Sequence, residues 1–167
     1  MSASDSLLPF LTFPALSVAQ LQALARRLAK AMAQGDCIAL AGEVGAGKTT
    51  FARALIGAIA VGMPEITSPT FTLMQSYDVT LANSSAALLW HLDLYRLKEA
   101  NEAHALGLEE IWPHVVLVEW PERIEGMLPT GYLSIVLDFT HSGAARSVHF
   151  YGNDAWRKRL ETLGLQA

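Results

Sequence analysis

The sequence has few of the features that mark secreted or membrane proteins. Cysteine occurs once, at Cys37, and no apolar run reaches the 18 or so residues that a transmembrane helix needs. A single cysteine cannot form an internal disulfide, and Cys37 stands in an apolar stretch where we expect a buried, unreactive thiol. Residues Met1 to Pro9 lack the basic start and long apolar segment of a signal peptide. We therefore expect a cytoplasmic protein with no membrane contact.

Charged residues are also scarce, and basic ones are in the minority. They make up 17% of the chain, and 12 Lys and Arg against 16 Asp and Glu give a formal net charge of −4. Proteins that bind nucleic acid tightly on their own usually carry a basic face. The one basic run near the end, Arg157-Lys158-Arg159, fits a solvated helix end better than an RNA-binding surface. If the protein serves a nucleic acid, we expect a partner to hold that nucleic acid.

The length predicts one globular unit. A chain of 167 residues can bury one substantial core but is short for two. We find no internal repeat, interdomain linker or low-complexity segment, so residues 1–167 form a single predicted domain, with residues 1–10 expected to be a flexible tail.

The stretch from Gly42 to Thr49 (GEVGAGKT) fits the P-loop pattern G-x-x-x-x-G-K-[ST] at every fixed position. The apolar run Asp36 to Ala41 before it predicts a buried strand, and Thr49 to Ala60 predicts a helix. Backbone N–H groups and the positive end of the helix dipole can surround a triphosphate at such a junction. Lys48 would then reach the β and γ phosphates, and the Thr49 hydroxyl would ligate Mg²⁺. The alternative is an ordinary glycine turn between a strand and a helix.

The rest of the chain alternates between strand and helix patterns. A capping box at Ser17 and apolar residues at helical spacing predict a helix that ends at Gly35. An acidic, helix-forming stretch interrupted by Gly107 predicts two short helices, and Asn153 is placed to cap a last helix. The predicted strands, two of them in a hairpin after residue 131, are 71–79, 87–95, 115–119, 132–139 and 146–151.

Two acidic residues belong to apolar predicted strands, Glu119 at the end of one and Asp93 inside another. Glu119 follows four consecutive apolar residues, which is the form of a Walker B strand, and a parallel strand delivers such an acid to the edge where phosphates bind. We expect Glu119 to hold Mg²⁺ or to orient the attacking water; a surface acid is the alternative. Asp93 lies in an apolar strand and needs a partner. It pairs with Arg96 or another cation, or it serves the Mg²⁺ site, and the spacing does not distinguish these.

Polar residues around the two acids are open to two interpretations. Thr70 and Ser68 lie in a hydroxyl-rich loop that can carry a hydroxyl to Mg²⁺ or to the γ-phosphate, or can merely cap a turn. His91 shares a strand face with Asp93, but no second His or Cys stands at ligand spacing, so an interior histidine is expected rather than a metal ligand. For Trp120 we expect packing rather than catalysis.

Absent motifs narrow the class of nucleotide-binding protein. The chain has no D-x-x-G switch and no N-K-x-D guanine reader, both of which a GTPase should have. It also lacks an Arg-rich nucleoside-kinase lid and a transporter signature, and it is short for a helicase. A small ATPase or a small kinase remains.

Four stretches taken together resemble the TsaE (YjeE) family of ATPases in bacterial tRNA threonylcarbamoyladenosine synthesis. They are GEVGAGKTT (42–50), SPTFT (68–72), HLDLYRL (91–97) and VEWPE (118–122), in that order and spacing. The resemblance covers roughly residues 17–152. It implies a single α/β P-loop NTPase domain with a central, mostly parallel sheet, additional antiparallel strands and helices on both faces.

The resemblance also implies ligands, partners and residue roles. ATP and Mg²⁺ are the implied cofactors, and the TsaB and TsaD proteins are the implied partners, with tRNA reached only through their complex. Thr49 and Glu119 are the implied Mg²⁺ ligands, and Lys48, Asp93 and Glu119 are the implied catalytic residues. The positions implied to contact the nucleotide are Gly42, Glu43, Val44, Gly45, Ala46, Gly47, Lys48, Thr49, Thr50, Thr70 and Arg146, the last near the base.

The resulting hypothesis is an Mg²⁺-dependent ATP-hydrolysing accessory protein that supports turnover of TsaB and TsaD in modifying A37 of tRNA. Catalysis would rest on positioning and charge neutralisation. Two alternatives stay open: a small-molecule kinase, and a nucleotide-sensing adaptor that does not hydrolyse ATP.

Overall fold

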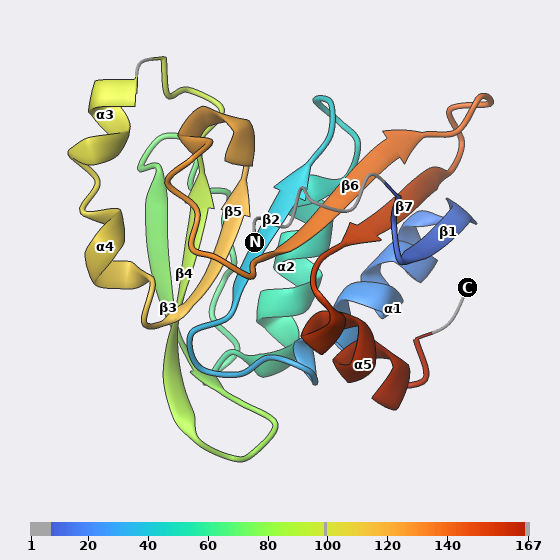
Figure 1. The fold of residues 1–167 in the computed structure, drawn as a ribbon, viewed down its shortest axis with the longest axis horizontal. Helices are drawn as coiled ribbons and strands as arrows, with labels where there is room; N and C mark the ends of the chain where they lie inside the picture. The colour runs from blue at the N-terminus through green and yellow to red at the C-terminus, as the bar shows by residue number, and fades with distance from the viewer. Residues whose placement is uncertain (1–7, 99, 166–167) are drawn as a thin grey trace.

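The chain folds into an α/β domain around one seven-stranded sheet (Figure 1). The computed structural model describes residues 8–98 and 100–165. The strands are β1 (Leu11–Leu16), β2 (Cys37–Ala41), β3 (Met74–Thr80), β4 (Ala86–Asp93), β5 (Val115–Glu119), β6 (Leu133–Phe139) and β7 (Arg146–Tyr151). The helices are α1 (Val18–Ala29), α2 (Lys48–Ile59), α3 (Ala100–His104), α4 (Leu108–Ile111), the 3-10 helix η2 (Pro121–Ile124) and α5 (Asp154–Thr162).

The strand order is β1-β7-β6-β2-β5-β4-β3. The four central strands β6, β2, β5 and β4 run parallel to one another, whereas β3 pairs antiparallel with β4, β7 with β6, and β1 with β7. This confirms the predicted α/β class with a parallel centre and antiparallel additions. The carboxyl ends of β2, β4 and β5 therefore meet at one edge of the sheet.

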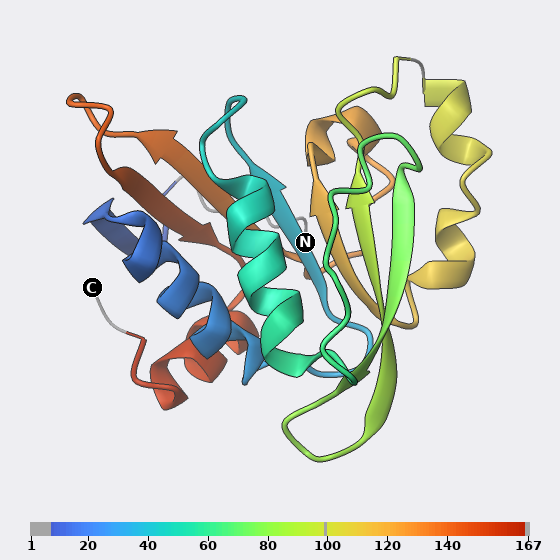
Figure 2. The same ribbon diagram turned by 180° about the vertical axis from the view of Figure 1, so that it is seen from behind.

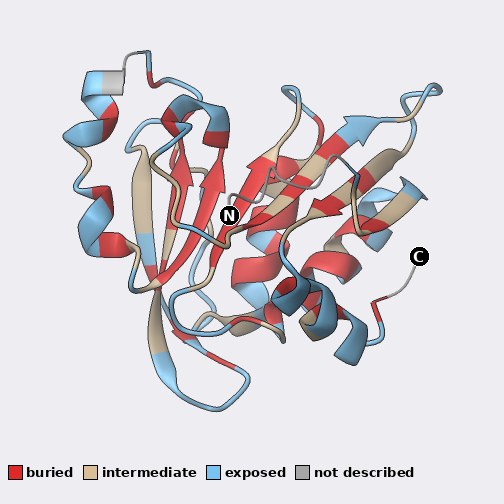
Figure 3. Cartoon of the chain, viewed as in Figure 1, coloured by how far each residue is buried: buried red, intermediate tan, exposed pale blue. Residues whose placement is uncertain are grey.

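Helices cover both faces of the sheet, as predicted. Figure 2 shows α1 and α2 side by side across one face, and Figure 1 shows α3 and α4 together near β3 and β4. The α1 and α2 face packs on residues such as Ile38, Leu40 and Leu117, and the other face packs on Leu92 and Val118. Strand β5 is buried at every residue and β2 at all but its last, because both faces of the sheet are covered there (Figure 3).

Local sequence signals account for most element ends. Ser17 and Gln20 form the capping box that begins α1, with Ser17 N–H donating to Gln20 Oε1 over 2.8 Å. The Asn153 side chain accepts from Trp156 N–H at the start of α5. Gly107, in the left-handed region at φ 65°, separates α3 from α4. Each of these boundaries was predicted from the sequence.

Strand β1 was not predicted. It lies at the edge of the sheet beside β7, contains Pro14, and its register with β7 shifts between Phe13 and Leu16. Proline is tolerated there because an edge strand needs only one set of ladder hydrogen bonds. Residues 1–7 of the expected flexible tail lie outside the described residues, while Phe10 N–H already donates to the Phe150 carbonyl over 2.9 Å.

In the part of the chain that the structure describes, no helix is long and apolar enough to cross a bilayer.

Candidate nucleotide site

The P-loop connects the carboxyl end of β2 to α2, where Gly42 permits a close approach of two backbones. Its φ is +136°, and a Cβ there would lie 2.2 Å from the Leu137 carbonyl oxygen of β6. No side chain fits in that space, so the glycine lets the loop lie against β6. At the other end of the loop, Gly47 begins α2 with a φ of 109° and no side-chain cap. The N–H groups of the first turn of α2 are therefore left for a ligand.

Lys48 is buried at the start of α2 and its ammonium group is held by the loop itself. Its Nζ donates to the carbonyl oxygens of Gly42, over 2.5 Å, and Glu43, over 2.7 Å. The same Nζ lies 4.0 Å from the centre of the Trp120 ring. Burial lowers the pKa of Lys48, and the negative charges of Glu119, Glu122 and Asp93 oppose that shift. The lysine is thus a buried cation, and the burial of its charge, not the acids beside it, favours an anionic ligand.

Glu119 ends β5 and is almost completely buried, with both carboxylate oxygens occupied. Oε2 accepts a hydrogen bond from the Thr49 hydroxyl over 2.9 Å, and Oε1 lies 2.9 Å from His91 Nε2. A carboxylate can only accept, so His91 Nε2–H is the donor. His91 Nδ1 is buried with no hydrogen-bond partner among the described residues. Thr49, Glu119 and His91 therefore form a chain from the P-loop helix into the interior of the sheet.

Asp93, at the end of β4, is held by neutral donors. Oδ2 accepts from the hydroxyls of Thr70, over 2.7 Å, and Ser68, over 3.1 Å, and Oδ1 accepts from Tyr95 N–H over 3.2 Å. Of the two options left open for Asp93, pairing with Arg96 is not what the structure shows, since the Arg96 guanidinium lies 4.1 Å from the Phe71 ring instead. The hydroxyl-rich loop that contains Ser68 and Thr70, called the hydroxyl loop below, therefore lies against Asp93.

Arg146, the first residue of β7, contacts the backbone of the P-loop. Its Nε donates to the Ala46 carbonyl over 3.0 Å and its Nη2 donates to the Gly45 carbonyl over 3.2 Å. Its guanidinium also lies 4.3 Å from the centre of the Phe139 ring. These contacts tie the hairpin of β6 and β7 to the loop, so Arg146 supports the P-loop from the side of the sheet where β6 ends.

Most of the predicted site residues meet around one cavity of about 300 Å³. It is lined by Val44, Gly45, Gly47, Lys48, Thr49, Thr50, Thr70, Asp93, Tyr95, Glu119 and Trp120. Gly42, Glu43, Ala46 and Arg146 do not line it: the first two supply carbonyl oxygens to Lys48, Ala46 is buried, and Arg146 holds the loop.

Three side chains of this cluster were not predicted as part of the site. They are His91, which reaches Glu119, and Tyr95 and Trp120, whose rings lie 5.0 Å apart at the cavity wall. Residue alternation along a strand gives the signal for His91, because it lies on the same face as Asp93 and β4 lies next to β5. Trp120 directly follows Glu119 in the chain. Its positive φ of 62° turns the backbone there, and the ring lies over the Lys48 ammonium group.

The side-chain oxygens of Thr49 and Glu119 fit a magnesium ion that also binds phosphate. No group of three or more His, Cys, Asp and Glu side chains within residues 8–98 and 100–165 could hold a metal on its own. Thr49 and Glu119 offer two neighbouring hard oxygens at the cavity wall. Mg²⁺ accepts such a set because it usually takes one or two protein oxygens and fills its octahedron with phosphate oxygens and water.

Comparison with known proteins points to one family. The family profile described as "Threonylcarbamoyl adenosine biosynthesis protein TsaE" matches residues 16–148. The chain is similar to the tRNA threonylcarbamoyladenosine biosynthesis protein TsaE of Rickettsia felis, with 37% identity over 69% of this chain and 65% of that protein. This match thus spans slightly less than two thirds of that relative. The protein of the same name from Bacillus subtilis is 39% identical over 70% of both chains.

A solved structure agrees with these matches. The fold is similar to the crystal structure of Bacillus subtilis YdiB, with a TM-score of 0.71 and 30% identity over 92% of this chain and 93% of that one. The similarity therefore covers nearly the whole chain.

Proposed function

Since the chain belongs to the TsaE family, we propose that it is a Mg²⁺-dependent ATPase that assists formation of N6-threonylcarbamoyladenosine at A37 of tRNA. Its ATP cycle would support turnover of the TsaB and TsaD proteins in the cytoplasm, with tRNA engaged through their complex. The observation that carries the proposal is the meeting of a P-loop lysine, a P-loop threonine and two buried acids around one cavity.

The P-loop supplies most of the binding of the triphosphate. The N–H groups at the start of α2 and the Lys48 ammonium group provide the positive charge. Lys48 binds two loop carbonyls in this structure, so phosphate oxygens would replace those carbonyls as its acceptors. Burial makes this exchange favourable, because a desolvated ammonium gains more from a charged partner than from a neutral one.

Thr49 and Glu119 are the residues that would hold the metal. When bound, Mg²⁺ neutralises phosphate charge and orients the transferring phosphoryl group. Glu119 cannot move freely toward a ligand, because His91 fixes its other oxygen over 2.9 Å. The histidine therefore positions the carboxylate.

Asp93 is proposed to act on the water that attacks the γ-phosphate. Its carboxylate lines the cavity and accepts three hydrogen bonds, from Ser68, Thr70 and Tyr95, which fix its orientation. An oriented carboxylate at this position can accept a hydrogen bond from water and align it. Thr70 also lines the cavity, so a change in the hydroxyl loop on nucleotide binding would reach Asp93 directly.

Phosphate release tests the proposal. We expect the purified protein to release phosphate from ATP in the presence of Mg²⁺, and the rate of modified tRNA formation by TsaB and TsaD to depend on that release. Phosphate transfer to an added small molecule would show a kinase instead. Nucleotide-dependent binding to TsaB and TsaD without phosphate release would show an adaptor, and either result would refute ATP hydrolysis as the function.

A further inference from the structure

The indole ring of Trp120 lies over the ammonium group of Lys48 at the wall of the nucleotide cavity. The ring centre is 4.0 Å from Nζ, which is within the range of a cation–π attraction. Both residues line the cavity. The sequence predicts only packing for Trp120, and the proposed function gives its ring no part. The ring nevertheless contacts the one side-chain cation of the P-loop.

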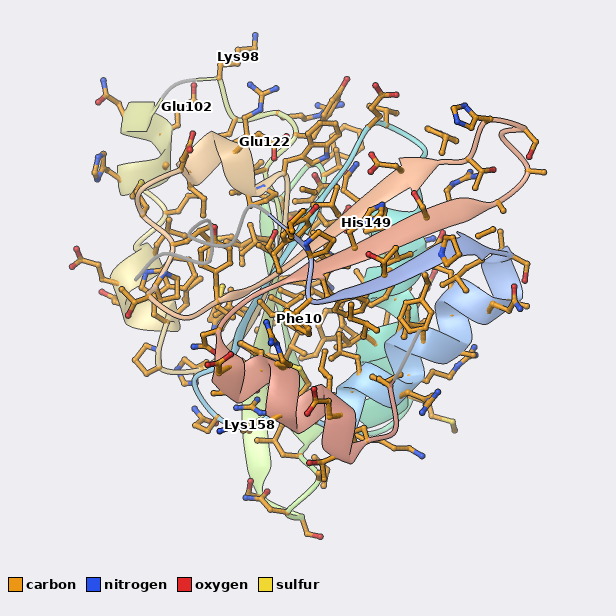
Figure 4. The ribbon with its side chains drawn as sticks, turned by 45° about the vertical axis from the view of Figure 1, so that its right-hand side comes forward. Phe10, Lys98, Glu102, Glu122, His149 and Lys158 are labelled. Atoms are coloured by element: carbon orange, nitrogen blue, oxygen red, sulfur yellow. The ribbon has the colours of Figure 1, made fainter. Side chains whose placement is uncertain are left out.

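The position of the Trp120 ring is set by its backbone and by a second ring. Trp120 has φ 62°, a conformation that a bulky residue rarely adopts. Its N–H donates to the Leu40 carbonyl over 3.3 Å, and its own carbonyl accepts from Arg123 N–H over 3.1 Å. The helix η2 begins directly after it, and Figure 4 shows Glu122 on that helix. The Tyr95 ring lies 5.0 Å away. The indole is therefore held in place, whereas the flexible stem of a lysine can move.

Neutral groups hold the Lys48 ammonium group. It has three N–H donors, and two hydrogen bonds go to the carbonyl oxygens of Gly42 and Glu43. The Trp120 ring is the third contact. Within residues 8–98 and 100–165, no carboxylate lies within 4.0 Å of the Lys48 Nζ. A phosphate oxygen is a stronger acceptor than any of these neutral groups, but it must first replace them.

We propose that Trp120 is a positioning residue that competes with phosphate for the ammonium group of Lys48. Its ring holds the lysine against the loop carbonyls, and the ammonium leaves the ring when it binds the phosphates of a nucleotide. The ring therefore weakens nucleotide binding and favours release of the product after each cycle. The inference rests on the part of the proposed function in which Lys48 binds phosphate.

The direction of the expected effect separates this role from packing. A partly desolvated cation–π contact corresponds to a factor of about 3 to 30 in a binding constant. Removing the ring should therefore raise the affinity for ADP by about that factor. A ring that only packs would have the opposite effect, because its loss would loosen the cavity wall and weaken binding.

The test replaces the four tryptophans of the full chain by a series of fluorinated tryptophans and measures ADP binding by calorimetry. Each fluorine withdraws electrons from the ring face and weakens its attraction for a cation, while the ring keeps nearly the same size. We expect the affinity for ADP to rise with each fluorine toward the value of Trp120→Leu. The same series in the Trp120→Leu background should show no trend, which assigns the effect to this ring.

A control variant and a direct probe of the lysine complete the test. Trp112→Leu is the matched control, because Trp112 packs against the same apolar cluster as Trp120, and ADP affinity should stay within about twofold. In NMR spectra of protein with ¹³C-labelled lysine, the Trp120 ring should shift the ε-methylene protons of Lys48 upfield before nucleotide is added. That shift should disappear in Trp120→Leu and on addition of ADP.

Three outcomes would overturn the role of Trp120. They are an affinity for ADP that falls with fluorination, an affinity that fluorination does not change, or an upfield Lys48 signal that persists with ADP bound. The fluorinated series keeps the full side chain, so it decides the question even if Trp120→Leu does not fold. ADP binding needs no hydrolysis. The predicted trend in a protein that releases no phosphate would therefore refute the ATPase proposal alone, and hydrolysis without the trend would refute the role of Trp120 alone.

Discussion

The two halves of the nucleotide cavity are built by different means. The phosphate half is one continuous stretch, Gly42 to Thr49, and offers mainly backbone groups and one lysine. The acid half combines Asp93 from β4 and Glu119 from β5, each held by side chains or N–H groups from other segments. The geometry of the phosphate half depends on the path of the backbone, whereas the geometry of the acid half depends on the hydrogen-bond partners of its two carboxylates. Substitutions should therefore affect the two halves differently.

The largest effect is expected from Gly42→Ala in the phosphate half. The new Cβ would overlap the Leu137 carbonyl oxygen at 2.2 Å, and neither atom can swing away, because the oxygen is part of the β6 backbone and the backbone of residue 42 fixes the Cβ. We expect a loss of at least about 3 kcal/mol in the free energy of unfolding, measured by urea denaturation. The matched control is Gly35→Ala, which also has a positive φ, +83°, but open space around the Cβ. Equal stability of the two variants would contradict the close approach.

Lys48→Met should separate binding from stability. It removes the cation that phosphate needs, so nucleotide affinity measured by calorimetry should fall at least about 100-fold. Burial holds the pKa of Lys48 below its ordinary value of 10.5, so its charge lowers the free energy of unfolding at neutral pH. This cost fades as the pH rises from the lowered pKa to 10.5.

The same variant should therefore be more stable than the unchanged protein at pH 7, by about 1 kcal/mol. Lys30→Met, at the exposed C-cap of α1, should change neither quantity appreciably. A Lys48→Met protein that is less stable and still binds nucleotide would refute this account of the buried lysine.

His91 tests the support of the acid half. His91→Leu removes the donor to Glu119, and we expect phosphate release to slow about 10-fold to 100-fold with little change in nucleotide affinity. His91→Gln can place an N–H near the position of Nε2 and should recover most of the rate. If the two variants are equally slow, the histidine serves packing and does not position Glu119.

The smallest effect is expected at the hydroxyl loop. Thr70→Val removes the shorter hydrogen bond to Asp93, 2.7 Å against 3.1 Å for Ser68, at nearly constant volume. One such bond to a charged group is worth about 1.5 kcal/mol, so turnover should fall by roughly 10-fold, and Thr70→Ser should retain it. Ser68→Ala should have the weaker effect, and the reverse order in steady-state rates would count against the geometry.

The phosphate half was predictable from sequence because its geometry is local. The glycines, the lysine and the strand and helix on either side all stand within residues 36–60. The capping residues Ser17 and Asn153 were predictable for the same reason, since each contacts a residue three positions further on.

The acid half was only partly predictable because its contacts depend on strand order and register. The sequence singles out Glu119 as an acid that ends an apolar strand and Asp93 as an acid within one. It does not predict that Asp93 accepts hydrogen bonds from Ser68 and Thr70 and has no cation as its partner. The His91 contact to Glu119 depends on β4 lying next to β5, which local spacing does not specify. Strand β1 was missed because Pro14 and an irregular register weaken its pattern.

The central claim is that the acid half carries out hydrolysis on a nucleotide that the phosphate half has already bound. The most direct test is phosphate release from ATP bound in advance to Glu119→Gln, with TsaB and TsaD present. The account predicts affinity within about threefold of the unchanged protein and release at least about 100-fold slower. Release at the unchanged rate would contradict it.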